Sequence, residues 1–135
     1  MSQERSKPRV AFVCVHNSCR SQMAEALTKY YGGERVDAFS GGTALKSAIN
    51  PQAVALIKEL YGIDMNETQR PKLLTELPEV DRVVTMGCNV VCPVLPYEYE
   101  SEDWGLEDPT GKPREEFIQV IREIDEKVQE LLKGL

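Results

Sequence analysis

A cysteine and an arginine that flank five residues are the first group whose types and spacing suggest chemistry. The segment is Cys14-Val-His-Asn-Ser-Cys-Arg-Ser21, which follows an apolar run and precedes a helix-forming stretch. A tight loop between a strand and a helix can point backbone N–H groups inward, and the helix N-terminus adds partial positive charge. Arg20 offers paired planar donors for two oxygens of a tetrahedral anion. The same field favours the thiolate of Cys14, so the spacing predicts a nucleophile activated where an oxyanion binds.

The other residues of this anion loop are expected to bind or support the oxyanion. Ser21 can donate a hydrogen bond to the thiolate, and Asn17 can brace the loop from within. His16, the only histidine, is expected to line the rim rather than form a Cys–His dyad, and Cys19 to pack as a buried thiol. The whole expected group is Val15, His16, Asn17, Ser18, Cys19 and Ser21. The plain alternative is a buried cysteine beside a surface arginine, which the flanking strand and helix signals disfavour.

A second pair of cysteines, Cys88 and Cys92, follows another apolar run. On a helix, positions i and i+4 share a face with Cα atoms about 6 Å apart. A disulfide there requires local unwinding, because the side chains otherwise diverge. The pair therefore suggests a segment that switches between a reduced helix and an oxidised loop. A four-cysteine zinc site is the rival, but it would consume Cys14 and leave the anion loop without a purpose. We expect no metal and no cofactor.

The candidate general acid is Asp108, which precedes Pro109. A carboxyl group fixed by a rigid neighbouring proline can give a proton to a departing oxygen and later take one from the incoming group. Glu107 is the fallback, although nothing in its position holds it as firmly. Aspartate–proline pairs are common in loops, so this signal gains its weight from the anion loop.

These residues need a scaffold, and alternating apolar runs and helical stretches predict one α/β domain over residues 1–135. The expected form is a three-layer sandwich with a four-stranded parallel sheet flanked by helices. Strands are expected at residues 9–15, 36–40 and 81–86, with a weak edge strand at 94–95 between prolines. Helices are expected at 21–31, 51–61 and 114–133, with a short helical turn at 73–74, and residues 97–113 are expected to be irregular. Cys14 and Cys88 both fall at carboxyl ends of strands, where ligands of such sheets bind.

The composition fits one soluble domain and restricts its partners. The chain has 135 residues, of which 41% are hydrophobic and 28% charged, as in ordinary globular proteins. Its formal net charge of −6 disfavours nucleic acid and anionic membranes as partners. The apolar stretch at residues 10–15 is too short for a signal peptide or a membrane helix. We therefore expect a cytoplasmic protein, in which static disulfides are disfavoured.

Two motifs carry a resemblance to a known family. They are Cys14-x-x-Asn-x-Cys-Arg-Ser-Gln-Met-Ala-Glu25 and Trp104-Gly-Leu-Glu-Asp-Pro109. Together they resemble the thioredoxin-coupled arsenate reductases, which share the low-molecular-weight tyrosine phosphatase fold, and the likeness covers nearly the whole chain. The phosphatases usually carry proline after the Cys-Arg-Ser run, where this chain has Gln22, and they lack the second cysteine pair. Both differences favour the reductase.

The resemblance implies arsenic detoxification through a cysteine relay. Cys14 would attack arsenate held by the loop and Arg20, while Asp108 protonates the leaving oxygen. Cys88 would then attack the Cys14 sulfur and release arsenite, and Cys92 would move the disulfide to where thioredoxin reduces it. Phosphate or sulfate would act as analogues of arsenate, and glutaredoxin or another thiol is the alternative donor. The two relay cysteines are closer together than in the best-known members, so the order of their attack stays open.

The resemblance also raises the question of a potassium ion, which some members bind beside the anion loop. Asn17, Glu25 and Ser40 fit that pattern, but Gln69-Arg-Pro71 stands where other oxygen ligands would be expected. No tight potassium site is therefore predicted. Two other functions stay open: an aryl-phosphate or protein-tyrosine phosphatase that uses the loop and its acid alone, and a non-catalytic zinc or redox-sensing module. Relatives often retain some phosphatase activity, so a weak phosphatase signal would not separate the first two.

Overall fold

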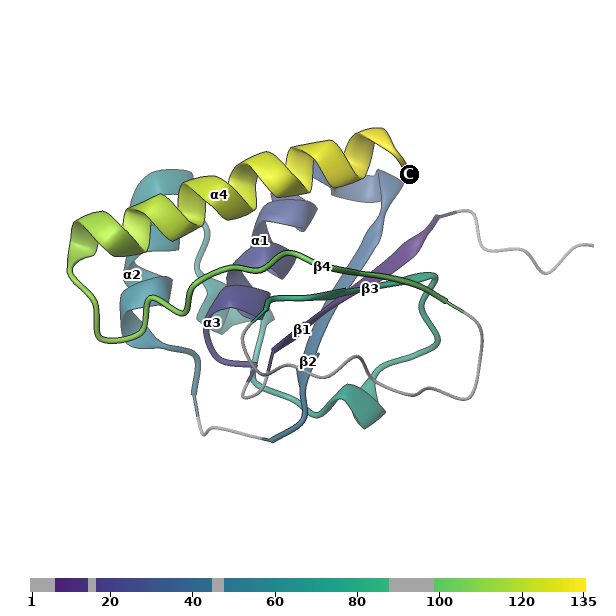
Figure 1. Ribbon diagram of the computed structural model, residues 1–135, viewed down its shortest axis with the longest axis horizontal. Coiled ribbons are helices and arrows are strands. Elements are labelled where there is room, and N and C mark those ends of the chain that lie inside the picture. Colours follow the sequence, from purple (N-terminus) through teal and green to yellow (C-terminus); the bar gives the residue numbers. More distant parts are fainter. Residues whose placement is uncertain (1–6, 15–16, 45–47, 88–98) are drawn as a thin grey trace, which may run out of the picture.

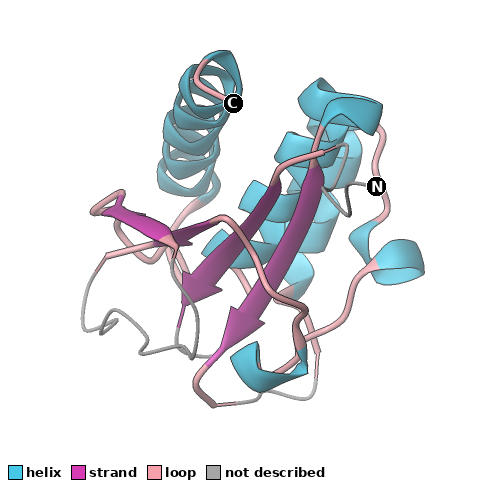
Figure 2. Ribbon diagram, turned by 90° about the vertical axis from the view of Figure 1, so that its right-hand side faces the viewer, coloured by secondary structure: helices cyan, strands magenta, loops and turns pink. Residues whose placement is uncertain are grey.

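The fold is built on a four-stranded parallel sheet. A computed structural model describes residues 7–14, 17–44, 48–87 and 99–135. The strands are β1 (Arg9–Cys14), β2 (Asp37–Gly42), β3 (Arg82–Thr85) and β4 (Glu100–Asp103), in the spatial order β2-β1-β3-β4. Each neighbouring pair is parallel, and Figure 2 shows the two longest strands, β1 and β2, side by side and pointing one way. The predicted parallel α/β sheet with flanking helices is confirmed.

Within the described residues, four α-helices and two short 3-10 turns accompany the sheet. The helices are α1 (Arg20–Gly32), α2 (Pro51–Tyr61), α3 (Met65–Thr68) and α4 (Arg114–Lys133), and the 3-10 turns are Gly33–Arg35 and Leu74–Glu76. Figure 1 shows α4 running along one side of the molecule next to α1. The three long helices and the turn near Leu74 were predicted, whereas α3 was not. No helix of the described ranges is both long and apolar enough to cross a membrane.

The second helix shows how the sequence sets an element's ends. The side chain of Asn50 accepts hydrogen bonds from the backbone N–H groups of Gln52 and Ala53, at 2.8 and 3.1 Å. Pro51 occupies the first helical position, where its missing N–H group costs nothing. Gly62 ends the helix in the left-handed conformation, with φ 74°. These ends agree with the helix predicted at residues 51–61.

The core lies mainly on one face of the sheet. On β1, Val10, Phe12 and Cys14 belong to a large cluster that also takes side chains from α1, α2 and α4. The alternate residues Ala11 and Val13 belong to a smaller cluster on the other face. Within the described ranges, that second face is covered by the segment containing the Leu74–Glu76 turn rather than by a long helix. β1 is therefore buried on both faces, as its continuous apolar sequence predicts.

The fourth strand corrects one prediction. Residues 97–113 were expected to be irregular, but Glu100–Asp103 forms β4 beside β3. The strand is polar and largely exposed, so no hydrophobic alternation marks it; backbone pairing with β3 defines it instead. Arg82 adds ion pairs to Glu100 at 3.2 Å and Glu102 at 2.8 Å. The edge strand predicted at residues 94–95 lies outside the described residues.

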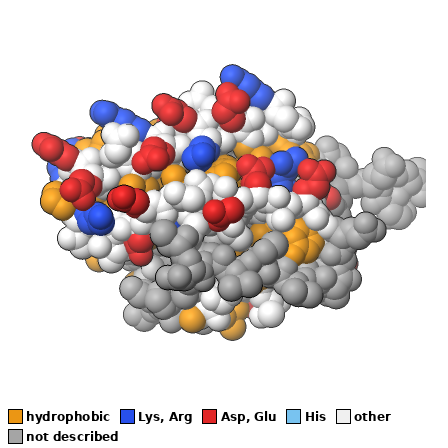
Figure 3. Space-filling view, in the orientation of Figure 1, with side chains coloured by type: hydrophobic (Ala, Val, Ile, Leu, Met, Phe, Trp, Pro, Cys, Tyr) orange, Lys and Arg blue, Asp and Glu red, His pale blue; other side chains and the backbone are white. Residues whose placement is uncertain are grey.

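The charged side chains are dispersed over the face shown in Figure 3. Acidic and basic groups alternate there without forming a continuous positive patch. This distribution agrees with the net charge of −6. A bound anion must therefore be held by local donors rather than by the field of the whole molecule.

Candidate active site

The predicted nucleophile lies at the carboxyl end of a central strand. Cys14 is the last residue of β1 and is 5% exposed. Its Sγ lies 2.8 Å from Oγ of Ser21, in the first turn of α1. Because Ser21 Oγ also accepts a hydrogen bond from Nδ2 of Asn17 at 2.9 Å, its own proton is best placed to donate to the sulfur. The structure thus brings together three of the predicted residues, with a hydroxyl donor directed at the sulfur of the predicted nucleophile.

Asn17 braces the loop, as its residue type suggests. It is fully buried and has φ 52°, a left-handed conformation that asparagine tolerates better than most residues. Its Oδ1 accepts from the backbone N–H of Lys72 at 2.9 Å and from Nε2 of Gln22 at 3.0 Å. The same Nε2 donates to the backbone oxygen of Asn17 at 2.9 Å. Every polar group of this side chain is therefore engaged in shaping the loop.

The guanidinium of Arg20 is buried rather than directed into solvent. Arg20 begins α1 and is 6% exposed. Its Nη1 donates to the backbone oxygens of Met86 at 3.1 Å and Leu106 at 2.8 Å. These two bonds fix the plane of the guanidinium through one nitrogen, while Nε and Nη2 carry the rest of its N–H fork. Sequence reasoning foresaw the fork but not its anchors, which lie more than sixty residues away along the chain.

A close approach of two backbones explains why those anchors meet. Gly87 has φ 90°, and a Cβ atom there would lie 2.6 Å from Cα of Gly105. The backbone N–H of Leu106 donates to the oxygen of Met86 at 2.8 Å. The chain leaving β3 therefore approaches the chain leaving β4 this closely because Gly87 has no side chain. This contact brings the loop of the predicted acid to the anion loop.

The predicted acid Asp108 is exposed at this edge of the site. Its Oδ1 accepts from Thr110, at 3.0 Å from the backbone N–H and 2.7 Å from Oγ1. Burial raises the pKa of Cys19 to about 12, and the negative charge of Asp108 adds to that rise. Cys19 is therefore a protonated, buried thiol, which fits the packing role expected of it, and Asp108 lies near enough to act on the loop electrostatically.

Asn50 links the anion loop to the acid's turn, a role that its sequence context does not reveal. Its backbone N–H donates to the oxygen of Ser18 at 2.7 Å. Its Nδ2 lies 3.4 Å from Oγ1 of Thr110. Asn50 caps α2, and the cap, the anion loop and the turn of the predicted acid therefore meet at this one residue.

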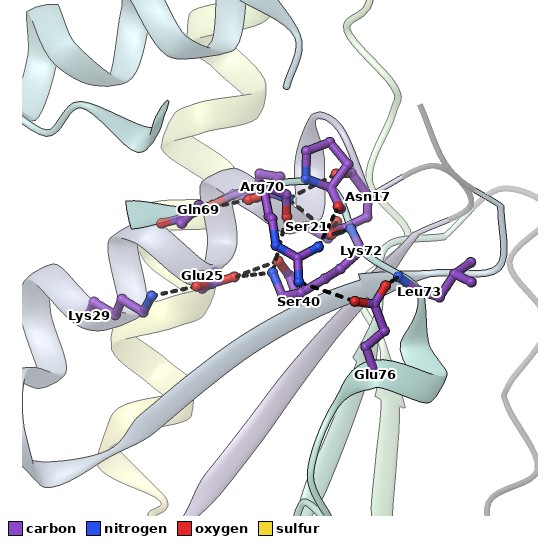
Figure 4. A network of polar contacts seen from close by, with 12 residues as sticks. Asn17, Ser21, Glu25, Lys29, Ser40, Gln69, Arg70, Lys72, Leu73 and Glu76 are labelled. Carbon is purple, nitrogen blue, oxygen red and sulfur yellow. Dashed lines mark hydrogen bonds and ion pairs between the residues drawn. The ribbon is translucent and has the colours of Figure 1, made fainter. Parts of the chain in front are cut away.

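A buried carboxylate lies behind the loop (Figure 4). The side chain of Glu25 is 4% exposed. It accepts from Oγ of Ser40 at 2.5 Å and pairs with Nζ of Lys29 at 2.5 Å and Nζ of Lys72 at 3.8 Å. Burial lowers the pKa of Lys72, and the charge of Glu25 opposes that change. Sequence reasoning missed Lys72, because nothing local marks a lysine for this place.

The same contacts test the fit of a potassium ion. The oxygens that the resemblance offers as ligands belong to Asn17, Glu25 and Ser40. Asn17 Oδ1 and the Glu25 carboxylate already accept from protein donors, and Ser40 is a donor to Glu25. An ammonium group of the chain itself stands beside the carboxylate. The residues present therefore do not fit a potassium site.

Some predicted residues cannot be placed in this geometry. Val15, His16, Cys88 and Cys92 lie outside the described residues. Ser18 is buried in the loop with its backbone oxygen bound to Asn50. Among the residues with described positions, no three His, Cys, Asp or Glu side chains are grouped as metal ligands would be.

Comparison with known proteins assigns the class. A family model described as low molecular weight phosphotyrosine protein phosphatase matches residues 9–135. The chain belongs to this family.

Within the family, the chain is similar to arsenate reductases. It is 39% identical over 126 residues to arsenate reductase 2 of Staphylococcus epidermidis, covering 91% of this chain and 95% of the relative. A solved arsenate reductase in the phosphate binding state superposes with a TM-score of 0.82 at 35% identity, covering 94% of this chain and 98% of the other. A thioredoxin-dependent arsenate reductase of Corynebacterium glutamicum gives 0.75 at 36% identity, covering 95% of this chain and 61% of the other.

Proposed function

We propose that this chain is an arsenate reductase of the thioredoxin-coupled class, which serves arsenic detoxification. The observation that carries the proposal is the Cys14 thiol, hydrogen-bonded to Ser21 at the end of β1 beside the anchored guanidinium of Arg20. This is an oxyanion site with a nucleophile inside it. The close similarity to arsenate reductases along nearly the whole chain supports arsenate as the oxyanion.

The first chemical step forms a bond between sulfur and arsenic. The Cys14 thiolate attacks arsenic(V), and one As–O bond breaks as the S–As bond forms. Asp108 supplies a proton to the departing oxygen, which leaves as water. Arg20 and the backbone N–H groups of the loop neutralise the remaining oxygens. A relative solved in a phosphate binding state supports phosphate as an analogue of the bound substrate.

The reduction itself uses the second cysteine pair. Cys88 attacks the sulfur of Cys14, the electron pair of the S–As bond passes to arsenic, and arsenite leaves. Cys92 then attacks Cys88, which frees Cys14 and leaves a Cys88–Cys92 disulfide. The dithiol of thioredoxin supplies the two electrons that reduce this disulfide. Support for the donor comes from the thioredoxin-dependent relative, and support for the relay from the spacing of the two cysteines.

The test is arsenate-dependent oxidation of NADPH in the presence of thioredoxin and thioredoxin reductase. The wild-type chain should turn over repeatedly, whereas Cys14→Ser, Cys88→Ser and Cys92→Ser should each stop multiple turnover. Cys19→Ser is the matched control and should retain most activity, because Cys19 is a protonated packing residue. Disulfide mapping of the trapped variants would then give the order of attack. A rate no higher than that of Cys14→Ser would contradict the proposal.

A phosphatase is the second candidate, and the family description favours it. Such an enzyme would need only Cys14, Arg20 and Asp108. Hydrolysis of p-nitrophenyl phosphate separates the two functions, because a phosphatase should survive Cys88→Ser and Cys92→Ser unchanged. Efficient hydrolysis by these variants, with no arsenate reduction by the wild-type chain, would assign the phosphatase.

A further inference from the structure

The segment Gln69 to Leu73 is hydrogen-bonded to the anion loop and to the first turn of α1. Nε2 of Gln69 donates to the backbone oxygen of Gln22 at 3.0 Å and to its Oε1 at 2.7 Å. The backbone oxygen of Arg70 accepts from Nε2 of Gln22 at 2.9 Å, and the backbone N–H of Lys72 donates to Oδ1 of Asn17 at 2.9 Å. The positions of Gln22 and Asn17 therefore depend on where this segment lies.

The side chain of Lys72 holds the segment in place. It is 16% exposed, so most of its length is removed from water. Its Nζ donates to the backbone oxygen of Arg70 at 3.2 Å and lies 3.8 Å from Oε1 of Glu25. The backbone oxygen of Lys72 accepts from the N–H of Gly42 at the end of β2. The ammonium group of Lys72 thus joins the segment to α1. The backbone oxygen of Lys72 joins the same segment to β2.

Glu25 needs this ammonium group. A buried carboxylate is costly unless it is paired and hydrogen-bonded. Lys29 pairs with it from the solvent side, since that side chain is 43% exposed. Glu25 also lies one helical turn beyond Ser21, which contacts the Cys14 sulfur. Without a cation on the loop side, its charge would oppose both the thiolate and the incoming oxyanion.

We propose that Lys72 is a positioning residue for the anion loop. Its ammonium is the counter-ion of Glu25 on the loop side, in addition to Lys29 on the solvent side, and it holds Gln69 to Leu73 where that segment fixes Asn17 and Gln22. Lys72 contacts no reacting atom and acts through Asn17 and Ser21 on Cys14. The side chain of Lys72 therefore supplies the positive charge that the Glu25 carboxylate requires. Anion binding should then not depend on potassium. This inference rests on the proposed function only for the identity of the natural anion.

The test compares two lysines on one carboxylate. Lys72→Met keeps an unbranched apolar side chain as far as the ε position and removes the charged nitrogen. Lys29→Met is the matched control, because Lys29 pairs with the same Glu25 and is not hydrogen-bonded to the segment Gln69 to Leu73. The readout is protection of Cys14 from iodoacetamide by phosphate, followed by peptide mass. Half-protection by Lys72→Met should need at least about fivefold more phosphate than wild type, and Lys29→Met less than about twofold more.

Three further measurements separate positioning from a general structural role. The double variant Glu25→Gln/Lys72→Met should bind phosphate better than Lys72→Met, because it removes the unpaired charge. Ammonium chloride should partly restore Lys72→Met, whereas tetramethylammonium chloride of equal ionic strength should not. Lys72→Arg keeps the charge and should stay within about threefold of wild type.

Specific results would overturn the proposal. They are equal effects of Lys72→Met and Lys29→Met, a double variant no better than Lys72→Met, failure of ammonium to restore it, or Lys72→Arg as weak as Lys72→Met. If Lys72→Met does not fold, the phosphate affinity of the wild-type chain can be measured in potassium chloride and in tetramethylammonium chloride. A higher affinity in potassium chloride would overturn the proposal. Phosphate protection needs no electron transfer. A chain that failed to reduce arsenate would therefore overturn the proposed function and leave this test intact.

Discussion

The carboxylates of Glu25 on α1 and Asp125 on α4 are held in different ways. This difference distinguishes contacts that shape the site from contacts that stabilise the fold. Glu25 on α1 is buried and neutralised by two lysines and a hydroxyl group from β2. Asp125 on α4 is half-buried and accepts hydrogen bonds from neutral groups instead. Tyr31 and Tyr61 donate to its Oδ2 at 2.7 and 2.5 Å, and Gln129 donates to its Oδ1 at 2.5 Å.

The elements that each carboxylate joins also differ. The partners of Asp125 lie on α1, α2 and α4 itself, so this cluster ties helices together, and its hydrogen bonds among the described residues include none to a loop of the site. The partners of Glu25 lie on α1, β2 and the segment that shapes the anion loop. Variants around the loop should therefore lose activity, with or without a loss of stability, and variants around Asp125 should lose stability alone.

The largest effect is expected from Arg20→Lys. Lysine keeps the charge but cannot donate to two backbone oxygens and also present a planar fork to the anion. The value of kcat/KM for arsenate should fall about 100-fold, a loss typical of removing a donor to developing charge. Thermal melting should shift by only a few degrees. An unchanged kcat/KM would show that charge alone suffices and would remove the distinction between the two regions.

The next effect is expected at Asn17. Asn17→Ala loses the bonds to Ser21, Gln22 and Lys72 and places alanine at φ 52°. Stability in urea should fall by about 2–3 kcal/mol, together with activity. Asn17→Gly is the control, because glycine accepts this conformation and should recover about 1 kcal/mol without restoring activity. Equal stability of the two variants would argue against the left-handed loop.

A smaller effect is expected from Tyr61→Phe. The change removes one hydrogen bond to Asp125 and should cost about 1 kcal/mol in urea unfolding. Arsenate reduction should stay within about twofold of wild type. Tyr31→Phe is the matched control, since it removes the other phenol from the same oxygen. A large loss of activity in either variant would show that the Asp125 cluster affects the anion loop, and would contradict the distinction between the two regions.

The smallest effect is expected on the stability of the chain at low pH, where Asp125 becomes protonated. Burial alone would raise the pKa of Asp125, but hydrogen bonds from Tyr61, Tyr31 and Gln129 outweigh it and hold the pKa below its usual value. A lowered pKa contributes stability that is present above the usual aspartate value and is lost as pH falls through the lowered one. Because the group is partly exposed, the contribution should be about 0.5 kcal/mol or less. Melting temperatures from pH 7 to pH 3 should fall less steeply for Asp125→Asn; an identical slope would contradict this assignment.

Local signals were enough to predict most of the fold. The continuous apolar sequence of β1, the Asn50-Pro51 start and Gly62 end of α2, and the helical spacing of α4 each determine an element with little help from elsewhere. The anion loop was also predictable, since strand, loop and helix follow one another along the chain. β4 was not, because an exposed edge strand needs no apolar pattern.

The supporting contacts of the site could not be predicted in the same way. Arg20 meets Met86 and Leu106, and Asn17 meets Lys72, across separations of 66, 86 and 55 residues. A lysine or glutamine with such a role looks like any polar residue until the chain is folded. Gln22 illustrates this, because its sequence shows only a departure from proline, whereas the structure shows a side chain that binds both the loop and Arg70.

The position of Asn50 has a practical consequence. Its side chain caps the amides of Gln52 and Ala53, and its backbone N–H donates to Ser18 in the anion loop. If anion binding shifts Ser18, the shift would reach these neighbouring amides through Asn50. Their resonances in a ¹⁵N-labelled sample therefore offer a native spectroscopic reporter of site occupancy, one that requires neither turnover nor a tag on the reactive sulfur.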